Sequence, residues 1–175
     1  LAHSFSKSCI RNPNGAPPYW RDVGTIDAFW SANLDLASIN PELDIYDTEW
    51  PIWTYQRQLP PAKFIPDISG MHGKAVNTIV SGGCIVKGSH LANTVLFSSV
   101  RIKSFCVLED AVVLPSVTID RSCRLKKVVI DRGCELPEGL VVGEDAALDA
   151  ARFERTDSGV VLITREMLAR LGQER

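Results

Sequence analysis

The sequence repeats every 17 residues between positions 83 and 145, and this repeat constrains the fold more than any other feature. Its rows read GCIVKGSHLANTVLFSS from 83, VRIKSFCVLEDAVVLPS from 100, VTIDRSCRLKKVVIDRG from 117 and CELPEGLVVGED from 134. Each row holds three short stretches of alternating residues, separated by small or polar residues. Because alternation sends every second side chain to the same face, each row predicts three short strands.

The columns of this repeat are chemically uniform, as stacked coils require. The apolar columns are Ile85, Ile102, Ile119 and Leu136; Leu91, Leu108, Leu125 and Val142; Val95, Val112 and Val129, with Leu96, Val113 and Ile130 beside them; and Cys106 and Cys123 above Leu140. Equivalent residues of successive coils should stack about 4.8 Å apart. Since no coil can bury its apolar face alone, neighbouring coils complete the core.

We therefore expect a mainly β fold, with a three-sided parallel solenoid over residues 80–145 and Cys106 and Cys123 as free thiols inside it. Seventeen residues is one short of three hexapeptides, which predicts one tight corner per coil. The pattern resembles known hexapeptide-repeat proteins, and a left-handed parallel β-helix is what this resemblance implies. An ordinary β-sandwich is the alternative.

Composition and charge exclude several classes of partner. The 175 residues carry a net charge of -2, and no run of Lys or Arg exceeds two residues. This argues against nucleic acid or an anionic membrane as partner, and no apolar run approaches the roughly 18–20 residues of a membrane span. Five scattered cysteines without a CxxC pair predict reduced core thiols in a cytoplasmic protein. The first residue is Leu, and we expect further chain upstream.

Helical patterns flank the repeat. Residues 25–38 predict an amphipathic helix with Thr25 as N-cap, Asp27 in the first turn, and an end before Pro41. Its apolar stripe is Ile26, Phe29, Trp30, Asn33, Leu34 and Ala37.

The connector and the C-terminal segment complete the expected organisation. Residues 39–75 contain five prolines and predict an extended connector, packed on neighbours by Trp50, Trp53, Tyr55 and Phe64. Residues 149–155 predict a short helix and 159–164 a short strand. Thr164 then caps a final helix over 165–171, which ends before Gly172.

The segment YWRDVGT at 19–25 resembles a motif of bacterial ADP-glucose pyrophosphorylases (glucose-1-phosphate adenylyltransferases), with the helix IDAFWSANLDL after it. Further stretches agree with the family in the same order: PELDIYD at 41–47, WPIWTY and LPPAKF within 50–64, VSGGCIVKGS at 80–89, and VLITREML at 161–168. The resemblance covers nearly the whole chain and identifies it as the C-terminal part of such an enzyme.

The resemblance implies transfer of the adenylyl group of ATP to glucose 1-phosphate, with Mg²⁺, in glycogen biosynthesis. Residues 1–66 would then be the end of an α/β nucleotidyltransferase domain with its connector, and 67–175 a regulatory and oligomerisation β-helix. No glycine-rich nucleotide loop occurs here. We expect this piece by itself to be inactive and the intact enzyme to be a homo-oligomer, by resemblance a tetramer.

Asp22 is the candidate catalytic residue, and by resemblance it helps to hold the magnesium ion that bridges the substrates' phosphates. Adenylyl transfer builds negative charge on phosphate oxygens, which a carboxylate-held Mg²⁺ offsets. The alternative is a carboxylate that braces the turn before the helix. Trp20 by resemblance lies at the glucose 1-phosphate pocket; an isolated tryptophan is more often a core residue.

Phosphate effectors are expected at the C-terminal end. By resemblance Arg132 reaches an AMP-type inhibitor site, or else it is a solvated corner, and Arg165 contacts a sugar-phosphate activator such as fructose bisphosphate. Guanidinium groups suit phosphates because they pair with two oxygens. The other expected effector residues are Glu166, Met167, Leu168, Ala169, Gln173, Glu174 and Arg175. The family often has Arg where Ala169 stands; Arg170 is a possible substitute, so the effectors' identity stays open.

Two other functions compete. Hexapeptide β-helices often carry acyl-CoA chemistry with a catalytic histidine, and His90 is the one histidine within the coils. The coils show no long loop, which that class usually has. The other is a purely structural oligomerisation module.

Overall fold

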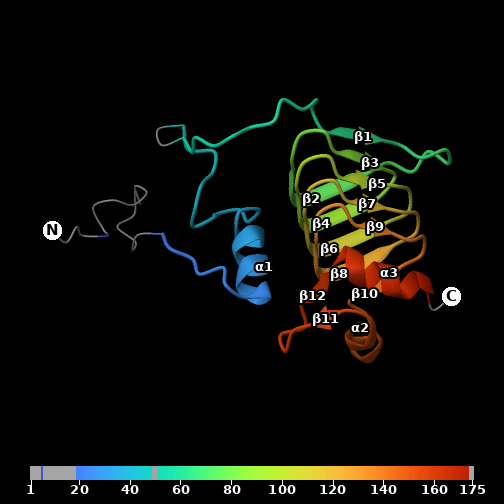
Figure 1. Cartoon of the computed structure of the whole chain (residues 1–175). Coiled ribbons are helices and arrows are strands. Elements are labelled where there is room, and N and C mark those ends of the chain that lie inside the picture. The colour runs from blue at the N-terminus through green and yellow to red at the C-terminus, as the bar shows by residue number, and fades with distance from the viewer. Residues whose placement is uncertain (1–4, 6–18, 49–50, 174–175) are drawn as a thin grey trace.

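The protein is a left-handed parallel β-helix with one helix against its side and two at its C-terminal end (Figure 1). It is described by a computed structural model that covers Phe5, residues 19–48 and residues 51–173. The helices are α1 (Ile26–Asp35), α2 (Ala146–Arg152) and α3 (Arg165–Gln173). The strands are β1 (Lys63–Ile65), β2 (Lys74–Val80), β3 (Ile85–Lys87), β4 (His90–Leu96), β5 (Arg101–Ile102), β6 (Val107–Val113), β7 (Thr118–Ile119), β8 (Arg124–Ile130), β9 (Glu135–Leu136), β10 (Val141–Val142), β11 (Glu154–Arg155) and β12 (Val161–Ile163).

Two sheets build the three faces of the solenoid. One sheet has the order β1-β3-β5-β7-β9, and the other runs β11-β12-β8-β6-β4-β2, with β10 also paired to β8. Every pair is parallel except β11–β12. Since β1 pairs with β3, the first rung lies on the N-terminal side of the boundary expected between residues 66 and 67. The division into two domains stays a prediction.

The long strands β2, β4, β6 and β8 each run over two faces of the triangle. Each bends at one residue with positive φ, and these residues form a column: Asn77 (46°), Asn93 (47°), Asp110 (52°) and Lys127 (55°). One left-handed residue turns the chain without interrupting the strand. This is the tight corner that the 17-residue period predicts.

The predicted columns are present with one correction in register, and all of them line the solenoid core except Val95, Val112 and Val129, which face outward. Leu108 pairs with Leu91 and Leu125, and Val112 with Val95 and Val129. At the start of the repeat, however, Ile102 pairs with Val86, whose side chain is buried, whereas Ile85 pairs with Arg101 and is 37% exposed. The column assignment of Ile85 was therefore wrong, because the first turn on this face has 16 residues rather than 17.

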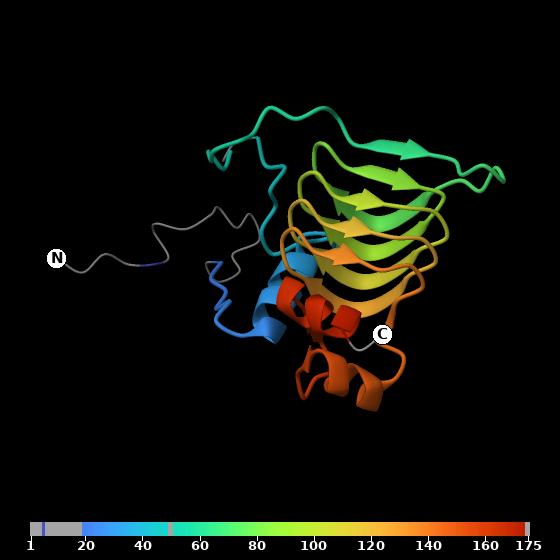
Figure 2. The same ribbon diagram turned by 45° about the vertical axis from the view of Figure 1, so that its right-hand side comes forward.

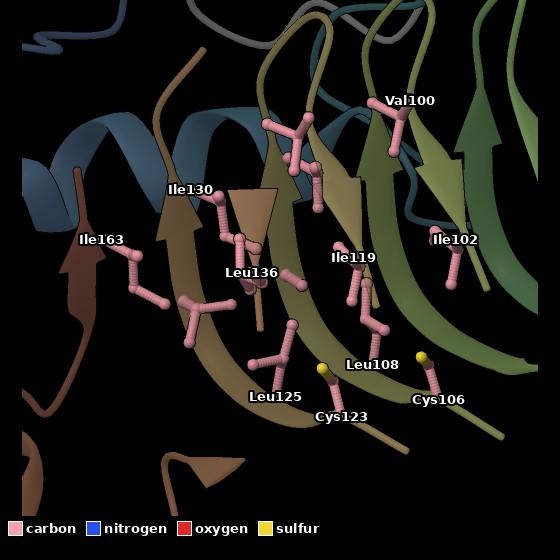
Figure 3. Close-up of a cluster of buried hydrophobic side chains, with 14 of the residues drawn as sticks. Val100, Ile102, Cys106, Leu108, Ile119, Cys123, Leu125, Ile130, Leu136 and Ile163 are labelled. Carbon is pink, nitrogen blue, oxygen red and sulfur yellow. The ribbon is translucent and has the colours of Figure 1, made fainter. Parts of the chain in front are cut away.

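The four cysteines in the described part of the chain match the prediction, and Cys9 lies outside the described residues. Cys84, Cys106, Cys123 and Cys134 are free and buried, and Figure 3 places the sulfurs of Cys106 and Cys123 among the stacked aliphatic side chains. Their S–H groups donate to the carbonyl oxygens of Asp120 (2.9 Å) and Pro137 (3.2 Å), respectively. A hydrogen bond with Cys106, together with burial, raises the pKa of the Cys123 thiol. These thiols are core residues.

Two short helices close the C-terminal end of the solenoid (Figure 2). Helix α2 begins three residues before the predicted start at 149, because Asp145 caps it, and it ends at Arg152 rather than 155, because β11 occupies Glu154–Arg155. Helix α3 follows Thr164 as predicted and lays Met167, Leu168 and Leu171 on the core. It continues through Gly172 to Gln173, so the expected end before Gly172 was wrong. None of the helices in the described part of the chain is long and apolar enough to cross a membrane.

Candidate functional site

Helix α1 packs on the outside of the β-helix. The valines of one predicted column, Val95, Val112 and Val129, point outward from β4, β6 and β8, and α1 contacts all three strands. The helix side chains that pack there are Ile26, Phe29, Trp30, Leu34 and Ala37. The predicted apolar stripe is therefore the contact face, and it fixes α1 to the β-helix.

The start of α1 is also as predicted. Thr25 is the N-cap, and its hydroxyl accepts from the backbone N–H of Ala28 at 3.1 Å. The helix ends at Asp35, before Pro41 but three residues short of the predicted end at 38. Asn33, the polar member of the stripe, donates its amide to the carbonyl oxygen of Phe29 at 2.8 Å.

Polar contacts fasten α1 to the tight corner. The indole Nε1–H of Trp30 donates to the carbonyl oxygen of Asp110 at 2.8 Å. The Nζ of Lys127, one coil further along, lies 5.4 Å from the centroid of the Trp30 ring. Within the same column, Asn93 donates to the Asp110 carboxylate at 2.6 Å. The tryptophan is thus held by an apolar contact, a hydrogen bond and a cation–π contact.

A second link joins α1 to the β11–β12 hairpin. Asp27 Oδ1 accepts from the hydroxyls of Thr156 (2.8 Å) and Ser158 (2.5 Å), which lie 129 and 131 residues further along the chain. These hydrogen bonds, first that from Ser158 and then that from Thr156, lower the pKa of the Asp27 carboxyl. The carboxylate expected only to favour the first helical turn therefore makes tertiary contacts.

The YWRDVGT segment folds back along α1. Arg21 forms ion pairs with Glu42 (3.1 Å) and, at 3.9 Å, with Asp35. Asp22 is exposed, and its Oδ1 accepts from the backbone N–H of Gly24 at 2.8 Å. Trp20 is 69% exposed. The candidate catalytic residue Asp22 and the candidate substrate-binding residue Trp20 therefore both lie on an open surface. The contact of Asp22 is the turn brace named as its alternative role.

Asp22 meets part of what a magnesium ion requires. In the described residues, no group of three or more His, Cys, Asp or Glu side chains could hold a metal ion. Magnesium in phosphate-transfer sites, however, is commonly held by one or two carboxylates together with substrate phosphates. The exposed Asp22 carboxylate, with one oxygen engaged by Gly24, fits that mode as a single protein ligand.

Two of the candidate effector arginines lie close together. Arg132 occupies an exposed corner, and Arg165 begins α3. The Cδ of Arg165 lies 3.9 Å from the place that a Cβ on Gly133, the neighbour of Arg132, would take. Burial, followed by the negative charge of Asp131, raises the pKa of the Cys134 thiol to about 11, against an opposing effect of Arg165. The Arg165 side chain therefore lies beside the corner that carries Arg132, 33 residues earlier in the chain.

The other candidate effector residues divide into two groups. Glu166 and Ala169 are exposed on α3, as is Arg170, whereas Met167 and Leu168 pack on the core. The two apolar side chains therefore hold the helix in place. The side chain of Gln173, and Glu174 and Arg175 as a whole, lie outside the described residues.

The connector aromatics do not pack as expected. Trp53 and Tyr55 are 90% and 87% exposed, and Phe64 is 43% exposed. Residues 51–58 are all exposed, so they have no neighbour in the described chain that could bury them. Trp50 lies outside the described residues.

His90, the histidine considered for acyl transfer, lies on the outer face of the sheet. It lines a shallow depression of about 320 Å³ with Lys74, Val76, Val107 and Glu109. This is an open face of β2, β4 and β6, and it gives no particular support to an acyltransferase site.

Sequence reasoning missed the partners of α1. Thr156, Ser158, Lys127 and Asp110 were not singled out, because they are far from α1 in the sequence and carry ordinary surface side chains. The corner residues Asn93, Asp110 and Lys127 offered a partial signal, because they are polar residues spaced 17 apart in the repeat.

Comparison with known proteins supports the resemblance. The chain is 60% identical, over 168 residues, to the glucose-1-phosphate adenylyltransferase of Paraburkholderia phytofirmans, a match that covers 96% of this chain and 40% of that relative. The chain thus spans well under half of the length of this curated relative. Residues 60–163, more than half of the chain, match the GlmU-like C-terminal hexapeptide family. This protein therefore belongs to the GlmU-like C-terminal hexapeptide family.

Proposed function

We propose that the chain is the C-terminal part of a glucose-1-phosphate adenylyltransferase, which makes ADP-glucose and pyrophosphate from ATP and glucose 1-phosphate in the cytoplasm, for glycogen synthesis. The 60% identity to a protein of that name, over nearly the whole chain, is the observation that carries the proposal. Since the match covers 40% of that relative, the rest of the catalytic machinery would lie in the part of the enzyme that this chain does not span.

The geometry supports a specific role for residues 19–35. Helix α1 is fixed to the β-helix by its apolar face and by Trp30, and Asp22 lies three residues before its N-cap. We call residues 19–25 the Asp22 loop. The β-helix would act as a rigid base from which this loop reaches a catalytic domain. A loop positioned by a rigid scaffold is a common way to present catalytic groups.

In this role, Asp22 would be a protein ligand of Mg²⁺, with Trp20 beside the glucose 1-phosphate. The ion would supply charge stabilisation on the phosphate oxygens when bound. The Gly24 N–H holds one oxygen of Asp22 and so limits the rotation of the carboxylate. Arg21, paired with Glu42, keeps the loop against α1.

Regulation is proposed at the other end of the β-helix. Arg132 and Arg165 are both exposed, and Arg165 lies beside the corner that carries Arg132. Guanidinium groups suit a phosphate because each can pair with two oxygens. We propose that a sugar-phosphate activator or an AMP-type inhibitor binds at this place, with homotetramers as the assembled form. Met167 and Leu168 support the site by packing α3 on the core.

The catalytic part of the proposal is tested in the intact enzyme with Asp22→Asn. Asp44→Asn is a matched control, since the exposed Asp44 makes the same bond, its Oδ1 accepting from the N–H of Tyr46 at 2.8 Å. The metal role predicts that turnover falls about 10²-fold or more for Asp22→Asn, with little change for Asp44→Asn. If the two variants behave alike, Asp22 is a turn brace.

The regulatory part is tested with Arg132→Ala and Arg165→Ala in the same enzyme. Each should weaken activation by fructose 1,6-bisphosphate or inhibition by AMP, while the rate without effector stays within about threefold. Unchanged effector curves for both variants would contradict the assignment and leave the arginines as surface charges.

A further inference from the structure

Among the described residues, the contact between Asp27 and the β11–β12 hairpin is the longest-range side-chain hydrogen bonding that α1 makes. Thr156 and Ser158 both donate to Asp27 Oδ1, and their own hydroxyl oxygens are 3.1 Å apart. We call these three residues the hairpin clamp. Thr25 caps the helix, so the Asp27 carboxylate is available for the hairpin.

Lys127 joins the clamp to the tight corner. Its Nζ donates to the carbonyl oxygen of Ser158 and also lies over the Trp30 ring. The same lysine therefore touches the hairpin and α1. Because Trp30 in turn donates to Asp110, α1 is held at two points along its length by adjoining parts of the β-helix.

The clamp lies between the two proposed sites. Asp27 follows Asp22 by five residues on the same helix start. On the other side, Ser158 leads into β12, which pairs in parallel with β8 at Val128–Ile130 and continues through Thr164 into Arg165. A shift of β12 or α3 would thus reach α1 through two hydrogen bonds to one carboxylate oxygen.

A helix transmits such a shift because it moves as a rigid body. Asp22 lies in the turn that leads into α1, where its carboxylate accepts from the Gly24 N–H. Its neighbour Arg21 pairs with Asp35, the last residue of α1, and with Glu42 beyond the helix. A displacement of the α1 start would therefore move the carboxylate that is proposed to hold the metal ion. Small misplacements of a catalytic group are enough to lower turnover strongly.

We propose that Asp27, Thr156 and Ser158 are positioning residues for the adenylyl transfer, which place the Asp22 loop and couple it to the end of the β-helix that carries Arg165. This rests on the proposed function. The clamp touches neither substrate nor metal ion; it acts through α1. Its two states are the bonded clamp, with the Asp22 loop in place, and a released clamp, with a displaced loop.

The test uses the intact enzyme with the hairpin side of the clamp removed, Thr156→Val with Ser158→Ala, so that α1 keeps its own sequence. Ser158→Ala alone is a milder variant, and Thr156→Ser with Ser158→Thr keeps both hydroxyls. Asp157→Asn is the control for the hairpin, since Asp157 is exposed between the two clamp residues. All are compared with the parent for melting temperature, so that unfolding is seen directly.

Four readouts are expected to move together. Turnover should fall about tenfold, and the Mg²⁺ concentration for half-maximal rate should rise about threefold, with the KM for ATP nearly unchanged. The activation by fructose 1,6-bisphosphate should shrink by about half or more. Amide hydrogen exchange in residues 26–35, measured without substrate or metal ion, should become about tenfold faster. The hydroxyl-keeping variant and Asp157→Asn should stay within about twofold of the parent.

Failure of this inference differs from failure of the proposed function. If Asp22→Asn abolishes turnover while the folded clamp variants keep normal turnover, Mg²⁺ dependence and activation, the clamp is structural only and the inference is wrong. If the clamp variants speed up exchange in α1 but leave activation by fructose 1,6-bisphosphate unchanged, the proposed coupling to the end that carries Arg165 is wrong. If Asp22→Asn keeps normal turnover, the proposed function loses its metal role, whatever the clamp variants do.

Discussion

The β-helix and the N-terminal segment bury their side chains in different ways. In the solenoid, Leu108, Val113 and Ile119 are fully buried, because each coil is covered by the coil before it and the coil after it. In the connector, Trp53 and Tyr55 are about as exposed as side chains become. The difference teaches that a repeat completes its core from its own sequence, whereas residues 51–58 of the connector have no such neighbour in the described chain.

Helix α1 lies between these extremes. It belongs to the N-terminal segment in sequence, yet its apolar face is covered by the outward valines of the β-helix. The exposed Asp22 loop is attached to this covered helix (Figure 1). The change from buried to exposed side chains therefore falls between α1, which begins at Ile26, and the candidate catalytic residue Asp22.

The largest expected effect compares one side chain from each region. Leu108→Ala should lower the free energy of unfolding of this chain by about 3 kcal/mol, because it leaves a cavity in a fully buried column. Trp53→Ala should change it by less than about 0.5 kcal/mol. Urea unfolding followed by circular dichroism measures both. Similar losses for the two variants would remove the distinction between the regions.

A smaller effect tests the register within the β-helix. Val86→Ala should cost about 1–2 kcal/mol, because Val86 fills the column below Ile102, whereas Ile85→Ala should cost much less. The two residues are adjacent, so they serve as controls for each other in the same unfolding experiment. A greater loss for Ile85→Ala would restore the uniform 17-residue register and contradict the structure.

Periodicity predicted most of the β-helix because each column repeats the same chemistry. It failed at Ile85 and Val86, since both are apolar β-branched residues and the one-residue shortening of that turn leaves the pattern looking regular. It also missed β1 and most of β2. Lys63–Ile65 is a short strand between prolines in the segment interpreted as connector, and Lys74–Val80 begins in that segment and precedes the repeat.

The site was predictable only in part. The helix start at Thr25 and the apolar face of α1 follow from local rules. The contacts of Asp27 with Thr156 and Ser158 do not, because they depend on how the chain returns after about 130 residues. The aromatic residues of the connector were expected to pack because of their type, but residue type does not specify a partner, and Trp53 and Tyr55 are exposed.

The smallest effect concerns acid. The Lys103 ammonium, 2.9 Å from Asp120, and the N–H of Arg121 lower the pKa of the Asp120 carboxyl. In the unfolded chain the pKa of an aspartate is about 3.9. Because the pKa of Asp120 is lower in the folded protein, its carboxylate stabilises the fold at pH values above about 3.9. This stabilisation is lost as the pH falls through the folded-state pKa. Asp120→Asn should therefore lower the melting temperature by roughly 1–2 °C at pH 7, and by less at pH 3. If Asp120→Asn lowers the melting temperature equally at pH 7 and at pH 3, the charge of the carboxylate is unimportant.

The most direct test of the account is one amide hydrogen-exchange measurement on this chain. The account predicts the slowest exchange in β4, β6 and β8, clear protection in residues 26–35 of α1, and little protection in residues 51–58. Protection in α1 that matches the sheet rather than the connector would confirm that the helix before the β-helix is fixed to it. Exchange in α1 as fast as in residues 51–58 would contradict the account, because the Asp22 loop would then have no rigid base.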